Sequence, residues 1–347
     1  MAPRGRRLYP VAMPPLPQLK AKDYASDQDV RWCPGCGDYA ILNAVQRVAQ
    51  ALQLRRENTV FVSGIGCSSR FPYYMNTYGF HTIHGRAPGF VTGLKLANPE
   101  LDVWMITGDG DGFSIGGNHL MHLLRRNVDV NVLLFNNRIY GLTKGQYSPT
   151  SETGKKTKST PMGSIDQPID PVRVALAAGA SFVARSADKD RGLTATLQAA
   201  AEHRGTSFVE IYQNCNIFND GAFDALTGKD TRDDSVLLCE PGKPLRFGKG
   251  GSRGIRVTGM SPEVVDVGEG GVTEDDLLFH DETNPNVANV LSNMHPPEFP
   301  EPFGILYRQK RETYEAQVHA QVDAAVDKRG RGTLDALLKA GDTYRVD

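Results

Sequence analysis

The sequence predicts an α/β protein built on a doubly wound, mostly parallel β-sheet. First, short β-rich apolar runs alternate with runs of helical periodicity from residue 38 to residue 212. Second, 347 residues, 40% of them hydrophobic and 23% charged, are enough for a large buried core in about two domains. Third, glycine-rich and polar turns follow directly after several apolar runs, as they do at the carboxyl edge of a parallel sheet.

The first expected element is an amphipathic helix that begins at Asp38. Ile41, Val45 and Val48 recur at helical spacing, and Asp38 is placed to cap the first turn. The elements expected after it are strands at 59–63, 103–107, 130–135, 181–184 and 208–212 and helices at 88–97, 115–126, 171–178 and 190–203. A polar stretch at 148–167 interrupts the alternation and predicts a long functional loop.

Two changes in composition divide the chain into three parts. Residues 1–30 are rich in proline and charge and lack the apolar run of a secretory signal, so we expect an N-terminal arm and a cytoplasmic protein. Residues 31–235 form the α/β domain. Residues 236–347 are an extension that begins with many prolines and glycines, which predict irregular backbone. It ends in two helices, near 314–326 and 334–338, whose apolar stripes suit packing on a larger body.

Charge and hydropathy exclude two broad classes of function. The chain has 39 Lys and Arg against 40 Asp and Glu, a formal net charge of −1, so it lacks the basic excess of a nucleic-acid-binding protein. Its longest apolar runs are too short to cross a membrane as a helix. The remaining classes are small-molecule enzymes and binding proteins.

The densest chemical signal is the run GDGDG at 108–112, together with the asparagine pair Asn136-Asn137. Each lies directly after an apolar strand, so both belong to the ligand-binding edge of the sheet. The Asp109 carboxylate and the Asn137 amide carbonyl, with a backbone carbonyl and phosphate oxygens, suit Mg²⁺ held with a diphosphate. A glycine-rich turn alone is often purely structural, but the asparagine pair 25 residues further on favours a ligand site.

Four of the five cysteines lie next to the same expected edge. Cys33 and Cys36 form a C-x-x-C before the first helix. Cys67 follows the first strand, and Cys215 follows the strand that ends at residue 212. Four thiolates suit a [4Fe-4S] cluster or a structural Zn²⁺; the C-x-x-C alone favours zinc, whereas two lone, distant ligands favour the cluster. Cys239 has no partner motif and is interpreted as an ordinary thiol.

The nucleotide-binding patterns G-x-G-x-x-G and G-x-x-x-x-G-K-S/T do not occur in the sequence. GDG followed after 25 residues by NN is the pattern of thiamine diphosphate enzymes, and the sequence resembles that superfamily. Over residues 30–220 it resembles, more specifically, the β subunit of the 2-oxoacid:ferredoxin oxidoreductases. The motifs that carry this resemblance are WCPGCG at 32–37, GIGCSS at 64–69, HGRA at 84–87, GDGD at 108–111 and NNRIYGLTKGQ at 136–146. The C-terminal part resembles the 2-oxoglutarate branch.

This resemblance implies a thiamine diphosphate-binding fold and a set of site residues. The residues implied to hold a [4Fe-4S] cluster are Cys33, Cys36, Cys67 and Cys215, and those implied to hold Mg²⁺ are Asp109, Asn137 and the carbonyl of Ile139. The residues implied to contact thiamine diphosphate are Ile65, Gly66, Cys67, Ser68, His84, Gly108, Gly110, Asp111, Gly141 and Leu142. The candidate catalytic residues of this chain are His84 and Lys144.

The resemblance also implies a reaction and partners. A 2-oxoacid, with 2-oxoglutarate favoured, is oxidatively decarboxylated to an acyl-CoA, coenzyme A being the co-substrate, and electrons pass through the cluster to ferredoxin. The carboxylate that activates the cofactor comes from a pyrimidine-binding domain, which the short segment after residue 235 does not supply. We therefore expect it on an α subunit, in an αβ unit doubled by a two-fold axis.

Three alternatives stay open at this point. The first is a pyruvate-specific member of the same family. The second is a non-redox thiamine diphosphate decarboxylase or synthase whose cysteines hold zinc or nothing. The third is a non-catalytic partner chain that keeps the fold; the intact Asp109 and Asn137 argue against it.

Overall fold

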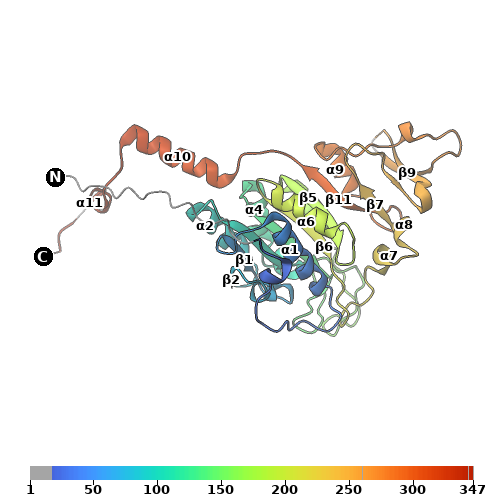
Figure 1. The fold of residues 1–347 in the computed structure, drawn as a ribbon, viewed down its shortest axis with the longest axis horizontal. Coiled ribbons are helices and arrows are strands. Elements are labelled where there is room, and N and C mark those ends of the chain that lie inside the picture. Colours follow the sequence, from blue (N-terminus) through green and yellow to red (C-terminus); the bar gives the residue numbers. More distant parts are fainter. Residues whose placement is uncertain (1–17, 260, 343, 347) are drawn as a thin grey trace.

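The protein is described here by a computed structural model that covers residues 18–259, 261–342 and 344–346. Its centre is an eight-stranded sheet with the strand order β2-β1-β3-β4-β6-β5-β11-β7 (Figure 1). The strands are β1 Thr59–Ser63, β2 Tyr78–His81, β3 Asp102–Gly108, β4 Asn131–Asn136, β5 Phe182–Ala187, β6 Ser207–Tyr212, β7 Val236–Cys239 and β11 Glu301–Arg308. The first six are parallel to one another, whereas β11 runs antiparallel to β5. The predicted doubly wound sheet is confirmed.

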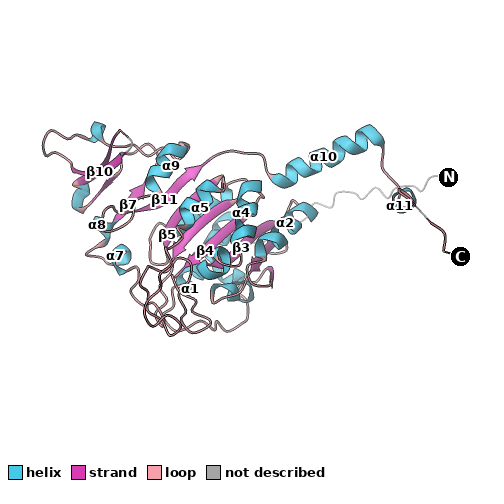
Figure 2. Ribbon diagram, turned by 180° about the vertical axis from the view of Figure 1, so that it is seen from behind, coloured by secondary structure: helices cyan, strands magenta, loops and turns pink. Residues whose placement is uncertain are grey.

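Helices cover both faces of this sheet because successive strand residues point to opposite sides. In β1, Phe61 belongs to the buried cluster on the face that α1 Asp38–Leu52 and α6 Leu193–Glu202 cover. Its neighbours Val60 and Val62 belong to the cluster on the other face, which α2 Ala87–Ala97, α4 Gly117–Arg126 and α5 Pro171–Ala177 cover. Figure 1 shows the α1 and α6 layer, and Figure 2 shows the other from behind. Both faces are covered, so β1 is buried along its whole length and β4 at all but its first residue.

Two details differ from the expected elements. The helix expected at 115–126 is preceded by a separate short helix, α3 Asp109–Phe113, which begins inside the glycine-rich run. Asp38 is not the cap of α1, because Gly37 occupies that position and Asp38 is the first residue of the helix. The Asp38 side chain is instead 1% exposed, and its carboxyl oxygens have no hydrogen-bond partner among the described residues. Burial raises the pKa of Asp38 to about 7.

The main sheet continues past the boundary predicted near residue 235. β7 and β11 both belong to residues 236–347, and they extend the sheet beyond β5. Instead of irregular backbone alone, this segment contains a small antiparallel sheet of β8 Arg246–Phe247, β9 Arg253–Thr258 and β10 Ser261–Asp266. Two short helices, α7 Asp224–Thr227 and α8 Arg232–Ser235, lie directly before this part, and α9 Pro285–Leu291 lies within it. The extension is therefore partly a continuation of the central sheet.

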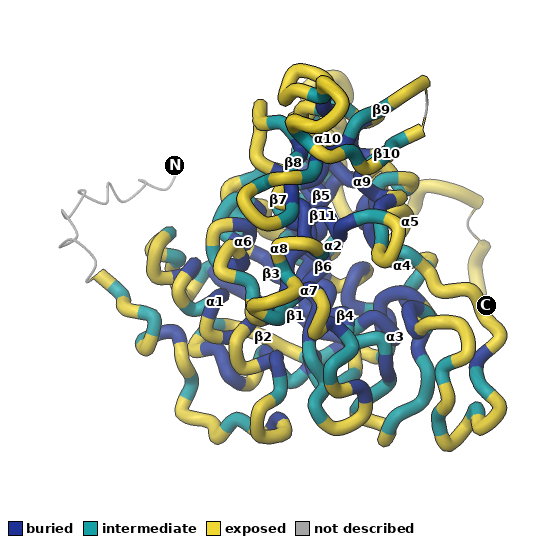
Figure 3. Tube along the Cα trace, turned by 90° about the vertical axis from the view of Figure 1, so that its right-hand side faces the viewer, coloured by how far each residue is buried: buried dark blue, intermediate teal, exposed yellow. Residues whose placement is uncertain are grey.

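The two closing helices exist, but they do not pack along the body as expected. They are α10 Tyr314–Arg329 and α11 Leu334–Leu338. Both project from the sheet in Figures 1 and 2, and Figure 3 shows most of their surface exposed. Leu334, Leu337 and Leu338 are 71–73% exposed. Their apolar stripes thus correctly indicated helices but wrongly indicated burial within this chain.

The N-terminal arm is described from residue 18, and the segment 1–17 lies outside the described residues. Residues 18–30 lie along α1: the backbone N–H of Ala21 donates to Gln50 (2.9 Å), and the Tyr24 hydroxyl donates to the Leu54 carbonyl (2.8 Å). Within the described ranges, the helices are all too short or too polar to cross a membrane.

Candidate functional site

The sheet brings the predicted site segments to one edge. In the strand register, Gly108 of β3 pairs with Phe135 of β4, and Asn136 of β4 pairs with Tyr212 of β6. The turns that follow these three strands are therefore neighbours, although they are separated by up to about a hundred positions in sequence. The turn after β1 lies at the same edge because β1 is parallel to β3.

Asp109 is a buried carboxylate at this edge, with 2% exposure. Its Oδ2 atom lies 2.5 Å from the Ser148 hydroxyl and 2.7 Å from the Thr150 hydroxyl. The Thr150 hydroxyl is also 2.9 Å from Oδ1 of Asn136, which ties the β3 and β4 turns together. Ser148 and Thr150 come from the long loop at 148–167, whose polar character was the signal that it is functional.

The charge of Asp109 is not balanced by the protein. Burial raises its pKa, hydrogen bonds lower it only in part, and within the described residues it forms no ion pair. A bound divalent cation would balance the charge and so remove the free-energy cost of burying the ionised carboxylate. Asn137 is the neighbouring candidate ligand; its Oδ1 accepts from the backbone N–H of Ile139 (3.2 Å). A buried carboxylate without a cationic partner beside an amide carbonyl fits a Mg²⁺ site.

Asp111 fixes the shape of the edge. Its Oδ1 atom accepts from the backbone N–H groups of Ile65 (3.0 Å) and Gly85 (2.8 Å) and from Nδ1 of His84 (2.6 Å). Its Oδ2 atom accepts from the Thr107 hydroxyl (2.7 Å). The carboxylate thus joins the turns after β1 and β2 to β3, so we assign it to positioning these turns.

The remaining predicted cofactor residues surround this frame. Gly110 must lack a side chain, because an added Cβ would lie 2.1 Å from the Tyr140 ring. The Tyr140 hydroxyl donates to the Gly110 carbonyl (3.1 Å). Ile65 and Leu142 leave 40% and 43% of their surface exposed, which gives the edge an apolar rim. The other predicted residues at this edge are Gly66, Ser68 and Gly108, with His84 partly exposed and Lys144 exposed in the loop after β4.

The three turns that carry the four cysteines are tied to one another. The backbone N–H of Gly37 donates to the Asn214 carbonyl (3.2 Å), and the Asn216 side chain donates to the Pro34 carbonyl (2.6 Å). Nε1 of Trp32 donates to the Cys67 carbonyl (2.7 Å). A Cβ added at Gly141 would lie 3.6 Å from the sulfur atoms of both Cys67 and Cys215. Cys33, Cys36, Cys67 and Cys215 therefore gather where the Asn137 segment passes.

The chemistry of these thiols suits a buried cluster. All are free, and burial raises the pKa of Cys67 to about 12 and that of Cys36 further. Such thiols are poor nucleophiles or redox pairs unless iron stabilises their thiolates. Among the described residues, no three His, Cys, Asp or Glu side chains are close enough to hold one metal ion.

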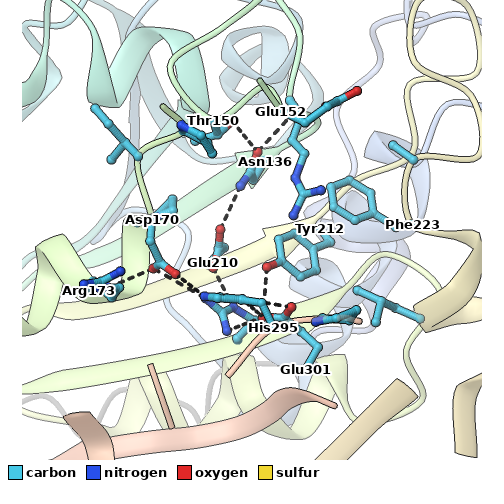
Figure 4. A pocket seen from close by; sticks show the side chains of 18 of the residues that line it. Asn136, Thr150, Glu152, Asp170, Arg173, Glu210, Tyr212, Phe223, His295 and Glu301 are labelled. Atoms are coloured by element: carbon cyan, nitrogen blue, oxygen red, sulfur yellow. Dashed lines mark hydrogen bonds and ion pairs between the residues drawn. The ribbon is translucent and has the colours of Figure 1, made fainter. Parts of the chain in front are cut away.

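A cavity of about 410 Å³ behind Asn136 holds a charge network that the sequence analysis missed (Figure 4). Arg185 is fully buried and forms ion pairs with Glu210 (2.7 Å) and Glu301 (2.5 Å). Glu210 in turn accepts from the Asn136 amide (2.7 Å). The sequence did contain a signal of this network, because Arg185 and Glu210 are charged residues inside the otherwise mostly apolar strands FVARSA and SFVEIY.

His295 connects this network to the C-terminal extension, and its titration should make stability depend on pH. Burial disfavours its protonation, but Asp170 (2.7 Å) and Glu301 (3.2 Å) outweigh this and raise its pKa to about 9. The protonated ring stabilises the folded state fully below about pH 6.5, which is the pKa of histidine in the unfolded chain. This stabilisation is lost as the pH rises through about 9, the pKa in the folded state. Thermal unfolding of wild type and H295Q from pH 6 to 10 should show a difference that shrinks over this range. A constant difference would contradict this assignment.

Comparison with known proteins decides the family. The family described as "Thiamine pyrophosphate enzyme, C-terminal TPP binding domain" matches residues 64–211. The chain is 54% identical over 334 residues to "2-oxoglutarate oxidoreductase subunit KorB" of Mycobacterium tuberculosis, covering 94% of this chain and 89% of that protein. It is 49% identical over 191 residues to "2-oxoacid:ferredoxin oxidoreductase 1, subunit beta" of Aeropyrum pernix, covering 54% of this chain and 60% of that protein. The chain belongs to the 2-oxoacid:ferredoxin oxidoreductase β subunits.

A solved structure agrees with this β-subunit assignment. The 2-oxoglutarate:ferredoxin oxidoreductase of Magnetococcus marinus, solved with 2-oxoglutarate, coenzyme A and succinyl-CoA bound, matches with a TM-score of 0.74 and 32% identity. The match covers 93% of this chain and 97% of that chain. This β subunit is thus part of an oxidoreductase of more than one chain, and the resemblance inferred from its motifs is confirmed.

Proposed function

We propose that this chain is the β subunit of a 2-oxoglutarate:ferredoxin oxidoreductase and carries thiamine diphosphate, Mg²⁺ and one [4Fe-4S] cluster at one sheet edge. The closeness of the two ligand sets carries the proposal. Gly141, four residues after Asn137, approaches both Cys67 and Cys215. Electrons released at the cofactor would have a short path to the cluster. The similarity to the Mycobacterium tuberculosis and Magnetococcus marinus proteins favours 2-oxoglutarate.

In the proposed reaction, 2-oxoglutarate, coenzyme A and two oxidised ferredoxins give succinyl-CoA, CO₂, two reduced ferredoxins and a proton. Thiamine diphosphate, when bound, supplies the electron sink for decarboxylation. Asp109, Asn137 and the Ile139 carbonyl would hold Mg²⁺, and Cys33, Cys36, Cys67 and Cys215 would hold the cluster. The backbone at Gly66, Ser68, Gly108 and Gly110 can approach the diphosphate, while the rim residues Ile65 and Leu142 exclude water.

His84 and Lys144 are the groups of this chain proposed to face the reacting atoms. Asp111 orients the His84 ring through Nδ1, which leaves Nε2 for a proton. Lys144 is exposed in a loop close to the edge and suits a substrate carboxylate or a phosphate. The carboxylate that activates the cofactor would come from an α subunit, in an (αβ)₂ assembly in the cytoplasm. Ferredoxin would be the electron acceptor.

Metal analysis of the anaerobically purified complex tests the redox function. We expect roughly four irons and four sulfides per β subunit and a brown colour that 2-oxoglutarate with coenzyme A bleaches. Stoichiometric zinc, or no metal at the cysteines of carefully protected protein, would instead favour the non-redox decarboxylase. Bleaching by pyruvate in place of 2-oxoglutarate would support the pyruvate-specific alternative.

Cysteine variants test which thiols hold the cluster. C215S should lower the iron content and the visible absorbance of the complex severely, because an [4Fe-4S] cluster needs four thiolates. C239S is the control: Cys239 is a free thiol as well, but it lies buried in β7. Iron content and absorbance should stay unchanged in C239S. Equal losses of iron in both variants would contradict the ligand assignment.

A further inference from the structure

Gln213 joins the predicted cation site to the predicted cluster site. It follows β6 directly and is 1% exposed. Its backbone N–H donates to the Asn136 carbonyl (2.9 Å). Its side-chain Oε1 accepts from Nδ2 of Asn137 (2.9 Å), and its Nε2 donates to the sulfur of Cys36 (3.1 Å) and to the Asn214 carbonyl (2.8 Å). One buried amide therefore contacts both predicted ligand sets.

We propose that Gln213 is a positioning residue that orients Asn137 toward the cation and tunes the cluster through Cys36. The inference rests on the proposed function, since it takes both residues as ligands. An asparagine amide can present either its oxygen or its nitrogen to a neighbour. Because Oε1 of Gln213 engages Nδ2 of Asn137, the carbonyl Oδ1 is the end left for a cation. Partners behind a ligand commonly fix its orientation in this way.

The second contact acts on the cluster. A hydrogen bond to a ligating sulfur stabilises the additional negative charge of the reduced cluster and so raises its reduction potential. The donor to Cys36 is the Gln213 amide, whose Nε2 lies 3.1 Å from the sulfur. A neutral amide supplies a donor without adding charge, and only a side chain with both an acceptor and a donor can serve Asn137 and Cys36 together.

The test uses the intact complex with Q213M and Q213E. Methionine has a similar length but neither polar group. In Q213M we expect the reduction equilibrium of the cluster to fall about tenfold, which is about 59 mV for one electron, and Mg²⁺-dependent thiamine diphosphate binding to weaken about 10- to 100-fold. Q213E keeps an acceptor for Asn137 and loses the donor to Cys36, so the potential should fall while cofactor affinity changes little. Q321E, the same substitution on the exposed face of α10, should change neither quantity.

The potential is read by redox titration with electron paramagnetic resonance, and cofactor affinity by calorimetry with Mg²⁺ and thiamine diphosphate. An unchanged potential and an unchanged affinity in Q213M, with full iron content, would overturn the role of Gln213 and leave the proposed function intact. Absence of iron from the unaltered complex would overturn the proposed function itself. If Q213M fails to assemble, the potential of Q213L, which also lacks both polar groups and adds no charge, decides the role: a fall supports it, and an unchanged value overturns it.

Discussion

Replacement of Asp109 by asparagine is expected to abolish Mg²⁺-dependent cofactor binding, and with it the activity of the complex. Mutation of a residue that only hydrogen-bonds to a metal ligand typically lowers metal affinity by about 10- to 100-fold. Loss of the ligating carboxylate itself should therefore lower it by at least about 100-fold. Asn137 and the Ile139 carbonyl would remain, but neither carries charge. Asparagine is close in size and can still accept from Ser148 and Thr150, so the fold should be kept.

The same substitution should leave the cofactor-free protein as stable as before, or make it more stable. Burial raises the pKa of Asp109, which means that its charge is a cost when no cation balances it. A gain in stability together with a loss of function is typical of a site residue. Calorimetry with Mg²⁺ and thiamine diphosphate, and thermal unfolding of the free protein, measure the two effects.

Asp102 offers a matched control at the opposite end of β3, away from the carboxyl edge. D102N removes the carboxylate at the start of the strand whose last residue precedes Asp109, and it should leave cofactor affinity unchanged. If D109N binds the cofactor as tightly as D102N does, Asp109 is not the cation ligand. If D109N is instead unfolded, the loss of binding carries no information on the cation, and D109E, which keeps the charge, becomes the comparison.

The sequence predicted the central sheet and the site edge because both depend on local patterns. The buried strands are continuous apolar runs, and a turn that follows such a strand lies at the carboxyl edge whatever the rest of the chain does. The strand at 59–63 was predicted with the bounds that the structure has. The positions of Asp109 and Asn136 followed from this rule alone. The strand β2, with exposed residues at the edge of the sheet, had no such apolar signal and was missed.

Partners that are distant in sequence could not be predicted in the same way. The four contacts of Asp111 reach back to residues 65, 84, 85 and 107, and no periodicity relates these positions. Gln213 contacts Cys36 across 177 residues. The burial of Asp38 likewise depends on what packs above it, so a residue that looks like a helix cap proves to be a buried carboxyl without a hydrogen-bond partner among the described residues. In α11, the spacing of the leucines indicated a helix, but it could not indicate whether another part of the chain covers them.

The second large effect is expected on stability, from R185M. Arg185 is fully buried, and its removal would leave Glu210 without a cationic partner and Glu301 with His295 alone. Removing one partner of a buried ion pair costs about 3–5 kcal/mol. Thermal or denaturant unfolding of R185M should show a loss of this size. Arg173 lines the same cavity but is exposed, so R173M should change stability by less than about 0.5 kcal/mol.

A combined variant separates loss of charge balance from loss of packing. In R185M/E210Q/E301Q, two of the three carboxylates that pair with Arg185 become neutral amides, and the third, Asp170, keeps His295 as its partner. The amide oxygen that E210Q introduces can still accept from the Asn136 side chain. Replacing a whole buried ion network by neutral groups is often far less costly than removing one member, so the triple variant should recover about half or more of the stability that R185M loses. If the triple variant is no more stable than R185M, the guanidinium contributes mainly by filling space. In that case the network would not be the electrostatic link between the C-terminal extension and Asn136 that its geometry indicates.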